Sequence, residues 1–288
     1  MVTSQPRAAV VYHPLKTDVP ALRAAVQQHE ARAGWAPSLW LETTESDAGQ
    51  GVTAEALEAG ARVVLASGGD GTIRAVAEAL RGSGTPLTVI PQGTGNLLAR
   101  NLGVPLGDFD EAVSAAFVGE NKPIDLGVVT ITRPDESEDE HVFLVLAGMG
   151  LDARAITATR SSLKKKLGWL AYVDAGMRTM IKDAPLQIHY SVDGAPMKSL
   201  TVFTVMIGNC GLLPGGVLLI PDAELDDGKL DVVALRPLGP FAWLRIWHKI
   251  GFENGVLRKS KTGRKVIDLV NDTRSVTYTR ARRYALSV

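Results

Sequence analysis

Apolar and amphipathic stretches alternate along the first part of the chain. Four short apolar runs predict buried strands, at Ala8–Tyr12, Leu39–Glu42, Arg62–Ala66 and Leu87–Ile90. Helices are expected between them, at Val19–Ala33, Ala54–Ala59 and Gly71–Arg81. In the last helix, apolar residues recur at helical spacing, at Ile73, Val76, Ala77 and Leu80. Strands that alternate with helices predict a parallel sheet covered by helices on both faces.

The pattern changes around Pro123, where strands begin to follow one another through loops and turns. Predicted strands are Val128–Thr132, His141–Leu146, Leu186–Val192, Thr201–Ile207, Lys229–Ala234, Lys265–Val270 and Val276–Tyr278. Helices are expected near Leu151–Met180 and Pro240–Ile250, and the acidic stretch 133–140 is interpreted as an exposed hairpin tip. A mainly antiparallel second domain is therefore expected, with the two domains at residues 1–125 and 126–288.

Composition is typical of an ordered globular protein. The chain has 288 residues, of which 45% are hydrophobic and 22% charged, which excludes a disordered class. A single cysteine, Cys210, excludes an internal disulfide and is interpreted as a small buried hydrophobic residue in a reducing compartment. The longest apolar run, Val142–Leu151, is far too short to span a bilayer. We expect a cytoplasmic protein that is at most peripherally bound to a membrane surface.

Charge is distributed unevenly along the sequence. The formal net charge is zero, but residues 245–288 contain 11 Lys+Arg against 3 Asp+Glu, a balance of +8. Two interpretations stand side by side: an ordinary solvated basic face, or a surface for anionic lipid or another polyanion.

Two glycine-rich turns follow consecutive predicted strands, Ser67–Thr72 and Pro91–Asn96. In a parallel sheet both turns would lie at the carboxyl ends of neighbouring strands, where such sheets bind ligands. Backbone N–H groups in such turns, together with threonine hydroxyls, suit phosphate oxygens. Neither turn is a P-loop or a dinucleotide fingerprint. Asp70 would repel phosphate, so we expect either a divalent cation that bridges acid and phosphate, or a base that accepts a proton from an attacking hydroxyl.

A third feature is the acidic loop Pro221–Asp231, in the predicted second domain. It carries five carboxylates, Asp222, Glu224, Asp226, Asp227 and Asp231. A hard cation with oxygen ligands and a solvated acidic turn are both compatible with this spacing.

Together these features resemble the diacylglycerol kinase catalytic domain of the soluble bacterial lipid kinases, a family that includes relatives of sphingosine and ceramide kinases. The resemblance covers nearly the whole chain. The matching segments are Val10–Pro14, Ser67–Thr72, Pro91–Asn96, Pro123–Gly127, Gly148–Asp152, Leu163–Gly168 and Pro221–Leu230. Gly-Gly-Asp-Gly-Thr is shared with NAD kinases, but its combination with the Asp-Asp-Gly loop is diagnostic. The resemblance implies a parallel-sheet nucleotide-binding domain followed by a mainly antiparallel β-sandwich domain for lipid acceptor and metal.

The resemblance also implies site residues. The ATP phosphates would be lined by Gly68, Gly69, Asp70, Gly71, Thr72, Ile73, Arg74, Gly93, Thr94 and Asn96, with Thr43 completing the site. Asp70 would be catalytic, acting through Mg²⁺. A structural Mg²⁺ would be held by the Asp227 side chain and the carbonyls of Glu224 and Lys229. The acceptor would be a lipid hydroxyl, with diacylglycerol as the first expectation. A homodimer is one option, and no nucleic-acid partner is expected.

Two departures from the family pattern stand out. His13 replaces an asparagine at a strand end. The family also has a late Asp-Gly-Glu turn whose glutamate is the proposed general base, whereas this chain ends at Val288 where that turn would begin. Asp193-Gly194-Ala195 is similar but belongs to an earlier predicted hairpin. Either the chain is shortened, or it is a form that lacks this base.

Two other functions are kept as alternatives. An NAD kinase would share the glycine turn, but the Asp-Asp-Gly loop opposes it. A non-catalytic lipid-binding regulatory protein is favoured by the missing Asp-Gly-Glu turn and opposed by the presence of Asp70 and Asp227. Lys164–Lys166, flanked by apolar residues, are interpreted either as a membrane contact or as part of a helix start or acceptor pocket.

Overall fold

The computed structural model describes residues 5–150, 185–213, 217–236 and 276–287. The chain divides into two units, Met1–Pro123 and Ile124–Val288. The predicted helices at Leu151–Met180 and Pro240–Ile250, the predicted strand at Lys265–Val270 and the lysines Lys164–Lys166 lie outside the described residues.

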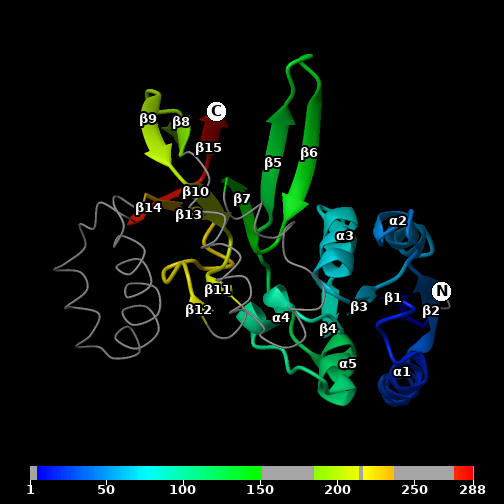
Figure 1. Cartoon of the computed structure of the whole chain (residues 1–288). Coiled ribbons are helices and arrows are strands. Elements are labelled where there is room, and N and C mark those ends of the chain that lie inside the picture. Colours follow the sequence, from blue (N-terminus) through cyan, green and yellow to red (C-terminus); the bar gives the residue numbers. More distant parts are fainter. Residues whose placement is uncertain (1–4, 151–184, 214–216, 237–275, 288) are drawn as a thin grey trace, which may run out of the picture. The chain divides into compact units, whose positions relative to one another are not determined.

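The first unit is an α/β domain with a parallel sheet (Figure 1). Its elements are β1 (Arg7–Tyr12), α1 (Val19–Ala33), β2 (Ala36–Glu42), α2 (Gln50–Glu58), β3 (Val63–Gly68), α3 (Asp70–Leu80), β4 (Leu87–Pro91), α4 (Leu97–Leu102) and α5 (Phe109–Val118). The four strands pair in the order β2-β1-β3-β4, and every pair is parallel. The predicted parallel sheet with helices on both faces is therefore confirmed.

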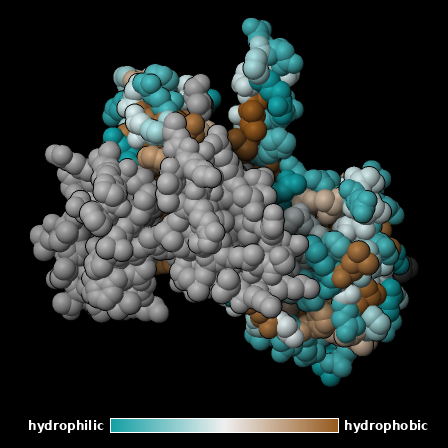
Figure 2. Space-filling model, in the orientation of Figure 1, coloured by the Kyte–Doolittle hydropathy of each residue, from teal (hydrophilic) through white to brown (hydrophobic). Residues whose placement is uncertain are grey.

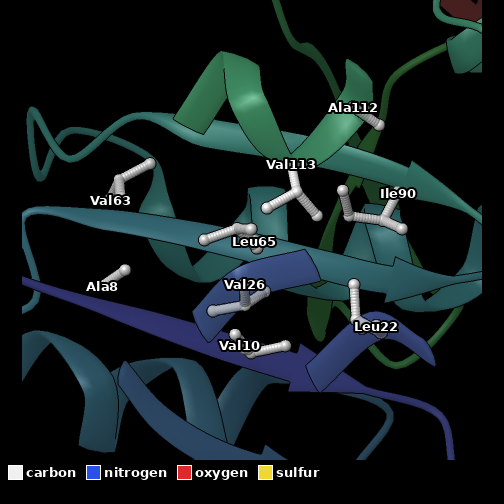
Figure 3. Close-up of a cluster of buried hydrophobic side chains, with 9 residues drawn as sticks. All are labelled: Ala8, Val10, Leu22, Val26, Val63, Leu65, Ile90, Ala112 and Val113. Carbon is white, nitrogen blue, oxygen red and sulfur yellow. The ribbon is translucent and has the colours of Figure 1, made fainter. Parts of the chain in front are cut away.

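One face of this sheet carries the core drawn in Figure 3. Successive strand residues point to opposite faces, so Val10 and Leu65 project to the same side. There they meet helices α1 and α5, and all members of the cluster are buried: Ala8, Val10, Leu22, Val26, Val63, Leu65, Ile90, Ala112 and Val113. The strand residues between them, such as Val11 and Val64, are equally buried and project to the other face. This double burial explains the continuous apolar runs in the sequence.

Helix ends in this unit follow local capping rules. The Asp18 side chain accepts a hydrogen bond from Ala21 N at the start of α1, and Gly34 ends that helix in the left-handed conformation at φ 70°. Helix α5 was not among the predicted elements. The Asp108 carboxylate caps it by accepting hydrogen bonds from the backbone N–H groups of Asp110 and Glu111.

The second unit is built from antiparallel strands. They are β5 (Gly127–Thr132), β6 (Glu138–Phe143), β7 (Leu146–Gly150), β8 (Leu186–Val192), β9 (Lys198–Val202), β10 (Thr204–Gly208), β11 (Leu212–Leu213), β12 (Val217–Leu218), β13 (Leu230–Leu235), β14 (Val276–Ala281) and β15 (Tyr284–Ser287). Among the described residues the strand orders are β14-β13-β10-β7, β15-β8-β9, β5-β6 and β11-β12. Two predicted strands are wrong as single strands. The predicted strand Thr201–Ile207 is divided between β9 and β10, and the predicted strand His141–Leu146 is divided between β6 and β7.

Two sheets of this unit share a core. Val205 and Val232 on one face of the larger sheet pack with Ile188 and Val202 from β8 and β9. The opposite face of β10 and β13 packs with Leu219 and other buried residues. This layered packing is that of a β-sandwich. Cys210 is buried as expected, and burial raises the pKa of its thiol to about 12.

The β5–β6 hairpin has a polar tip, with apolar atoms exposed farther along it (Figure 2). Val128 and Ile131 are exposed apolar residues of β5. The predicted acidic tip is only partly a turn, because residues 138–140 belong to strand β6. Among the described helices, none has the length and apolar character needed to cross a membrane.

Candidate functional site

The two glycine turns lie beside each other, as the sequence predicted. Strands β3 and β4 are neighbours with Gly68 opposite Pro91, and Gln92 N donates a 2.8 Å hydrogen bond to Gly68 O. A Cβ added to Gly93 would stand 2.7 Å from the Gly69 Cα, closer than real Cβ atoms approach a backbone. The contact between the turns therefore requires glycine at position 93.

Asp70 joins the first turn to the second. Its Oδ1 accepts a 2.6 Å hydrogen bond from Leu97 N, the first residue of α4. Its Oδ2 lies 2.7 Å from the position that a Cβ on Gly95 would take, so the carboxylate also fills the space beside that glycine. A carboxylate at a helix N-terminus is electrostatically favourable. This contact gives Asp70 a structural role, and local sequence patterns carry no signal for it because the partners are 27 positions apart.

Asn96 fixes the shape of the second turn. It adopts the left-handed conformation at φ 48°, and its side chain is buried. Its Oδ1 accepts a hydrogen bond from Gly93 N and its Nδ2 donates one to Gly93 O, each at 2.7 Å. These bonds are made within the turn itself, so its backbone is preorganised.

The remaining predicted phosphate-site residues occupy different environments. Thr72 is buried against Gly68, where an added Cβ would stand 2.7 Å from the Thr72 Cβ. Ile73 is 3% exposed and its N–H donates to Gly69 O, which argues for a packing role. Arg74 forms a 3.0 Å ion pair with Glu78 on the same helix.

Thr43 and Thr94 differ in exposure. Thr43 is buried at the end of β2, where its N–H donates to Tyr12 O at 3.0 Å, whereas Thr94 is exposed in the second turn.

Helix α3 begins directly after Gly69, and no side chain caps its first N–H groups. Those N–H groups, and those of the adjoining glycine turn, can donate hydrogen bonds to phosphate oxygens, because an uncapped helix start has unsatisfied donors.

The acidic loop of the second unit centres on Asp227. Its Oδ1 accepts a 3.0 Å hydrogen bond from Lys229 N, while its Oδ2 is buried and accepts none. Within the described ranges, Arg280 Nη1 lies 3.5 Å and Lys229 Nζ 3.8 Å from this Oδ2. Arg280 also donates through Nε to Asp231 at 3.0 Å. Burial raises the pKa of Asp231, and the hydrogen bond from Arg280 opposes that rise.

Asp125 ties the start of the second unit to this loop. Its N–H donates to Leu225 O and its Oδ2 accepts from Gly228 N, both at 2.6 Å. Its carbonyl oxygen accepts from Asn209 Nδ2 at 2.7 Å. The sequence motif around Pro123 pointed to this segment, but the bonds to residues more than 80 positions away are visible only in the fold.

The donor atoms at the loop are of a kind that a hard cation prefers. Across the described residues, no three His, Cys, Asp or Glu side chains gather in a metal-binding arrangement. The predicted ligand set does not require such a cluster, because it consists of one carboxylate and two backbone carbonyl oxygens. The buried Oδ2 of Asp227, which accepts no hydrogen bond, fits such a set.

Comparisons with known proteins identify both units. Residues 7–129 match the diacylglycerol kinase catalytic domain, and residues 145–256 match the YegS C-terminal NAD kinase beta sandwich-like domain. A Pseudomonas aeruginosa (strain UCBPP-PA14) protein named "Probable lipid kinase YegS-like" is 34% identical over 232 residues, which cover 80% of this chain and 72% of that protein. A protein of Bacillus subtilis (strain 168) named "Diacylglycerol kinase" is 31% identical over 248 residues, which cover 83% and 77%.

A solved structure shares the fold. The crystal structure of a candidate diacylglycerol kinase from Bacillus anthracis str. Sterne superimposes with a TM-score of 0.70 at 23% identity, covering 99% of this chain and 86% of that one. The matches of both units to these family models, together with the relatives named lipid kinase and diacylglycerol kinase, define a kinase of the lipid-kinase class. The chain belongs to the family of lipid kinases that carry the diacylglycerol kinase catalytic domain. The predicted family, fold class and enzyme class are confirmed.

Proposed function

We propose that the protein transfers the γ-phosphoryl group of ATP to a lipid hydroxyl, with diacylglycerol as acceptor and phosphatidic acid as product. The observation that carries the choice of acceptor is the 31% identity to the Bacillus subtilis protein named diacylglycerol kinase. The other named relative is described only as a lipid kinase, so it supports the class of acceptor and not the headgroup.

In this proposal the glycine turns bind the ATP phosphates through backbone N–H groups. The lipid hydroxyl oxygen forms a bond to the γ-phosphorus, the bond from that phosphorus to the β,γ-bridging oxygen breaks, and ADP leaves. The hydroxyl proton passes to a base. Such a reaction depends mainly on positioning and charge neutralisation, which suits a site of preorganised amides with few charged side chains. Asp70 is the proposed catalytic residue, and its bond to Leu97 N holds it between the turns.

Mg²⁺ is proposed at the acidic loop. The ligands would be the Asp227 carboxylate and the carbonyl oxygens of Glu224 and Lys229, and the buried Oδ2 of Asp227 supports this assignment. A cation there would neutralise the carboxylates of the loop and order it. The side chains of Arg280 and Lys229 neutralise part of the same charge.

The membrane association is proposed to be peripheral. A diacylglycerol acceptor stays in the bilayer, so the enzyme must reach the headgroup layer. Cationic side chains are attracted to an anionic membrane surface, and the basic segment 245–288 and Lys164–Lys166 supply them in the sequence.

Phosphate transfer to separate acceptors tests the proposal. γ-labelled ATP is supplied with vesicles that contain diacylglycerol, with vesicles that contain sphingosine, and with NAD in solution. We expect the label in phosphatidic acid. Label in another lipid would change the acceptor, label in NADP would favour an NAD kinase, and no transfer to any acceptor would favour a non-catalytic lipid-binding protein.

A further inference from the structure

The loop after β1 is anchored firmly to the end of β3. His13 N donates to Ser67 O at 2.9 Å, and Thr17 N donates to His13 O at 3.1 Å. Thr17 is buried, and its hydroxyl lies 3.2 Å from Ser67 O and 3.0 Å from Ser67 Oγ. Lys16 stands between these two anchored residues, and its own N–H donates to His13 O at 3.2 Å. The backbone that carries the Lys16 side chain is therefore fixed against the end of β3.

This loop brings the Lys16 ammonium to the meeting point of the two glycine turns. Lys16 Nζ lies 3.5 Å from the position that a Cβ on Gly69 would take, and Gly93 Cα lies at the same distance from that position. The ammonium therefore lies within van der Waals distance of the space above Gly69. A phosphate bound to the turns would lie beside a positive charge.

Three other charged side chains near the turns form ion pairs or hydrogen bonds within the protein. Arg74 pairs with Glu78, and Arg100 Nε donates to Gly95 O at 2.8 Å. Asp70 accepts from Leu97 N. Within the part of the chain that the structure describes, Lys16 has no carboxylate at ion-pair distance, although its side chain lies next to the turns.

We propose that Lys16 is a nucleotide-binding residue whose ammonium contacts phosphate oxygens of ATP. The inference rests on the proposed use of ATP at the glycine turns and adds a residue that none of the sequence motifs marked. Lysine suits this role because its ammonium is a compact charge on a flexible stem, which can follow the phosphates as they shift during transfer. Lys16 is exposed, so its removal leaves the core intact.

The test compares binding of ATP and adenosine to the full chain by isothermal titration calorimetry. Lys16→Gln is expected to weaken ATP binding about tenfold or more, because a charge-assisted contact is lost. Adenosine, which has no phosphate, should bind the variant as it binds the parent. Lys16→Arg should restore most of the ATP affinity. Lys198→Gln, at an exposed lysine of β9, is the matched control and should bind ATP like the parent.

Two results would overturn the inference while leaving ATP use intact: Lys16→Gln binding ATP as tightly as the parent, or losing ATP and adenosine to the same degree. A parent protein that does not bind ATP would overturn the proposed function and this inference with it. Thermal unfolding of each variant, expected to match the parent, separates a lost contact from a lost fold.

Discussion

The carboxylate of Asp70 accepts a 2.6 Å hydrogen bond from the backbone N–H of Leu97, so the acid of the first glycine turn holds the start of the helix that follows the second. This hydrogen bond explains why an acidic residue occupies a glycine-rich turn of the kind that binds phosphate. Its negative charge is placed at a helix start, where backbone donors compensate it. The two turns are thereby linked through a side chain as well as through the sheet.

The first prediction separates the structural role of Asp70 from its chemical role. Asp70→Asn keeps an oxygen that can accept from Leu97 N, and we expect its melting temperature to stay close to that of the parent. Asp70→Ala removes the acceptor and should lower the free energy of unfolding by about 1–3 kcal/mol. Chemical denaturation of the three proteins measures the difference. Equal stability of the Ala and Asn variants would contradict the bridging role.

The second prediction concerns the close approach of the two turns. In Gly93→Ala the new Cβ would stand 2.7 Å from Gly69 Cα and 2.8 Å from Asn96 Oδ1. Because both neighbours are fixed, we expect a loss of about 1–3 kcal/mol in unfolding free energy, together with weaker ATP binding.

The matched control for this variant is Gly71→Ala in the first turn of α3. An added Cβ meets nothing within 4 Å there, and the residue has no positive φ. Its stability should therefore be unchanged or rise by up to about 1 kcal/mol. Equal stability of the two variants would show that close packing of the turns does not require glycine at position 93.

The third prediction tests the acidic loop. If Asp227 holds Mg²⁺, the parent should melt at a higher temperature in Mg²⁺ than in a chelator, because a cation bound only by the folded state stabilises it. Asp227→Ala should lose this Mg²⁺-dependent rise. Asp135→Ala, in the exposed turn of the β5–β6 hairpin, should retain it. A rise that persists in Asp227→Ala would show that Mg²⁺ binds elsewhere.

The fourth prediction concerns binding to membranes and rests on the sequence alone. Changing Lys164, Lys165 and Lys166 together to Gln should reduce sedimentation with anionic vesicles at low salt, since each cation near such a surface contributes about 1 kcal/mol. The difference should shrink at high salt because charges are screened. Binding that neither the substitution nor salt changes would refute an electrostatic contact at these lysines.

Local patterns in the sequence predicted much of the first unit. Helix α1 was predicted at its observed bounds, and the structure shows that Asp18, Pro20 and Gly34 are its local start and stop signals. The adjacency of the two glycine turns followed from the rule that consecutive β-α-β strands tend to be neighbours. Helix α5 was not predicted, although its Asp108 cap is a local sequence signal. No helix or strand was expected between Asn101 and Lys122.

The site was predicted less completely than the fold. The bonds from Asp70 to Leu97 and from Asp125 to Gly228 join residues far apart in the chain, so no local pattern encodes them. The position of Lys16 over Gly69 also depends on the fold, because it results from the anchoring of one loop to the neighbouring strand. Motif matching also placed Ile73 in the phosphate site, and its side chain is buried.

The proposed phosphoryl transfer is best tested by the rate at which phosphatidic acid forms from γ-labelled ATP and diacylglycerol in anionic vesicles. The parent is compared with Asp70→Asn. We expect labelled phosphatidic acid with the parent and a rate at least about a hundredfold lower with the folded variant, because removing one charged or hydrogen-bonding group at a reacting centre typically costs that much. Labelled lipid formed by both proteins at similar rates would contradict the catalytic role of Asp70, and its absence with the parent would contradict the proposed reaction.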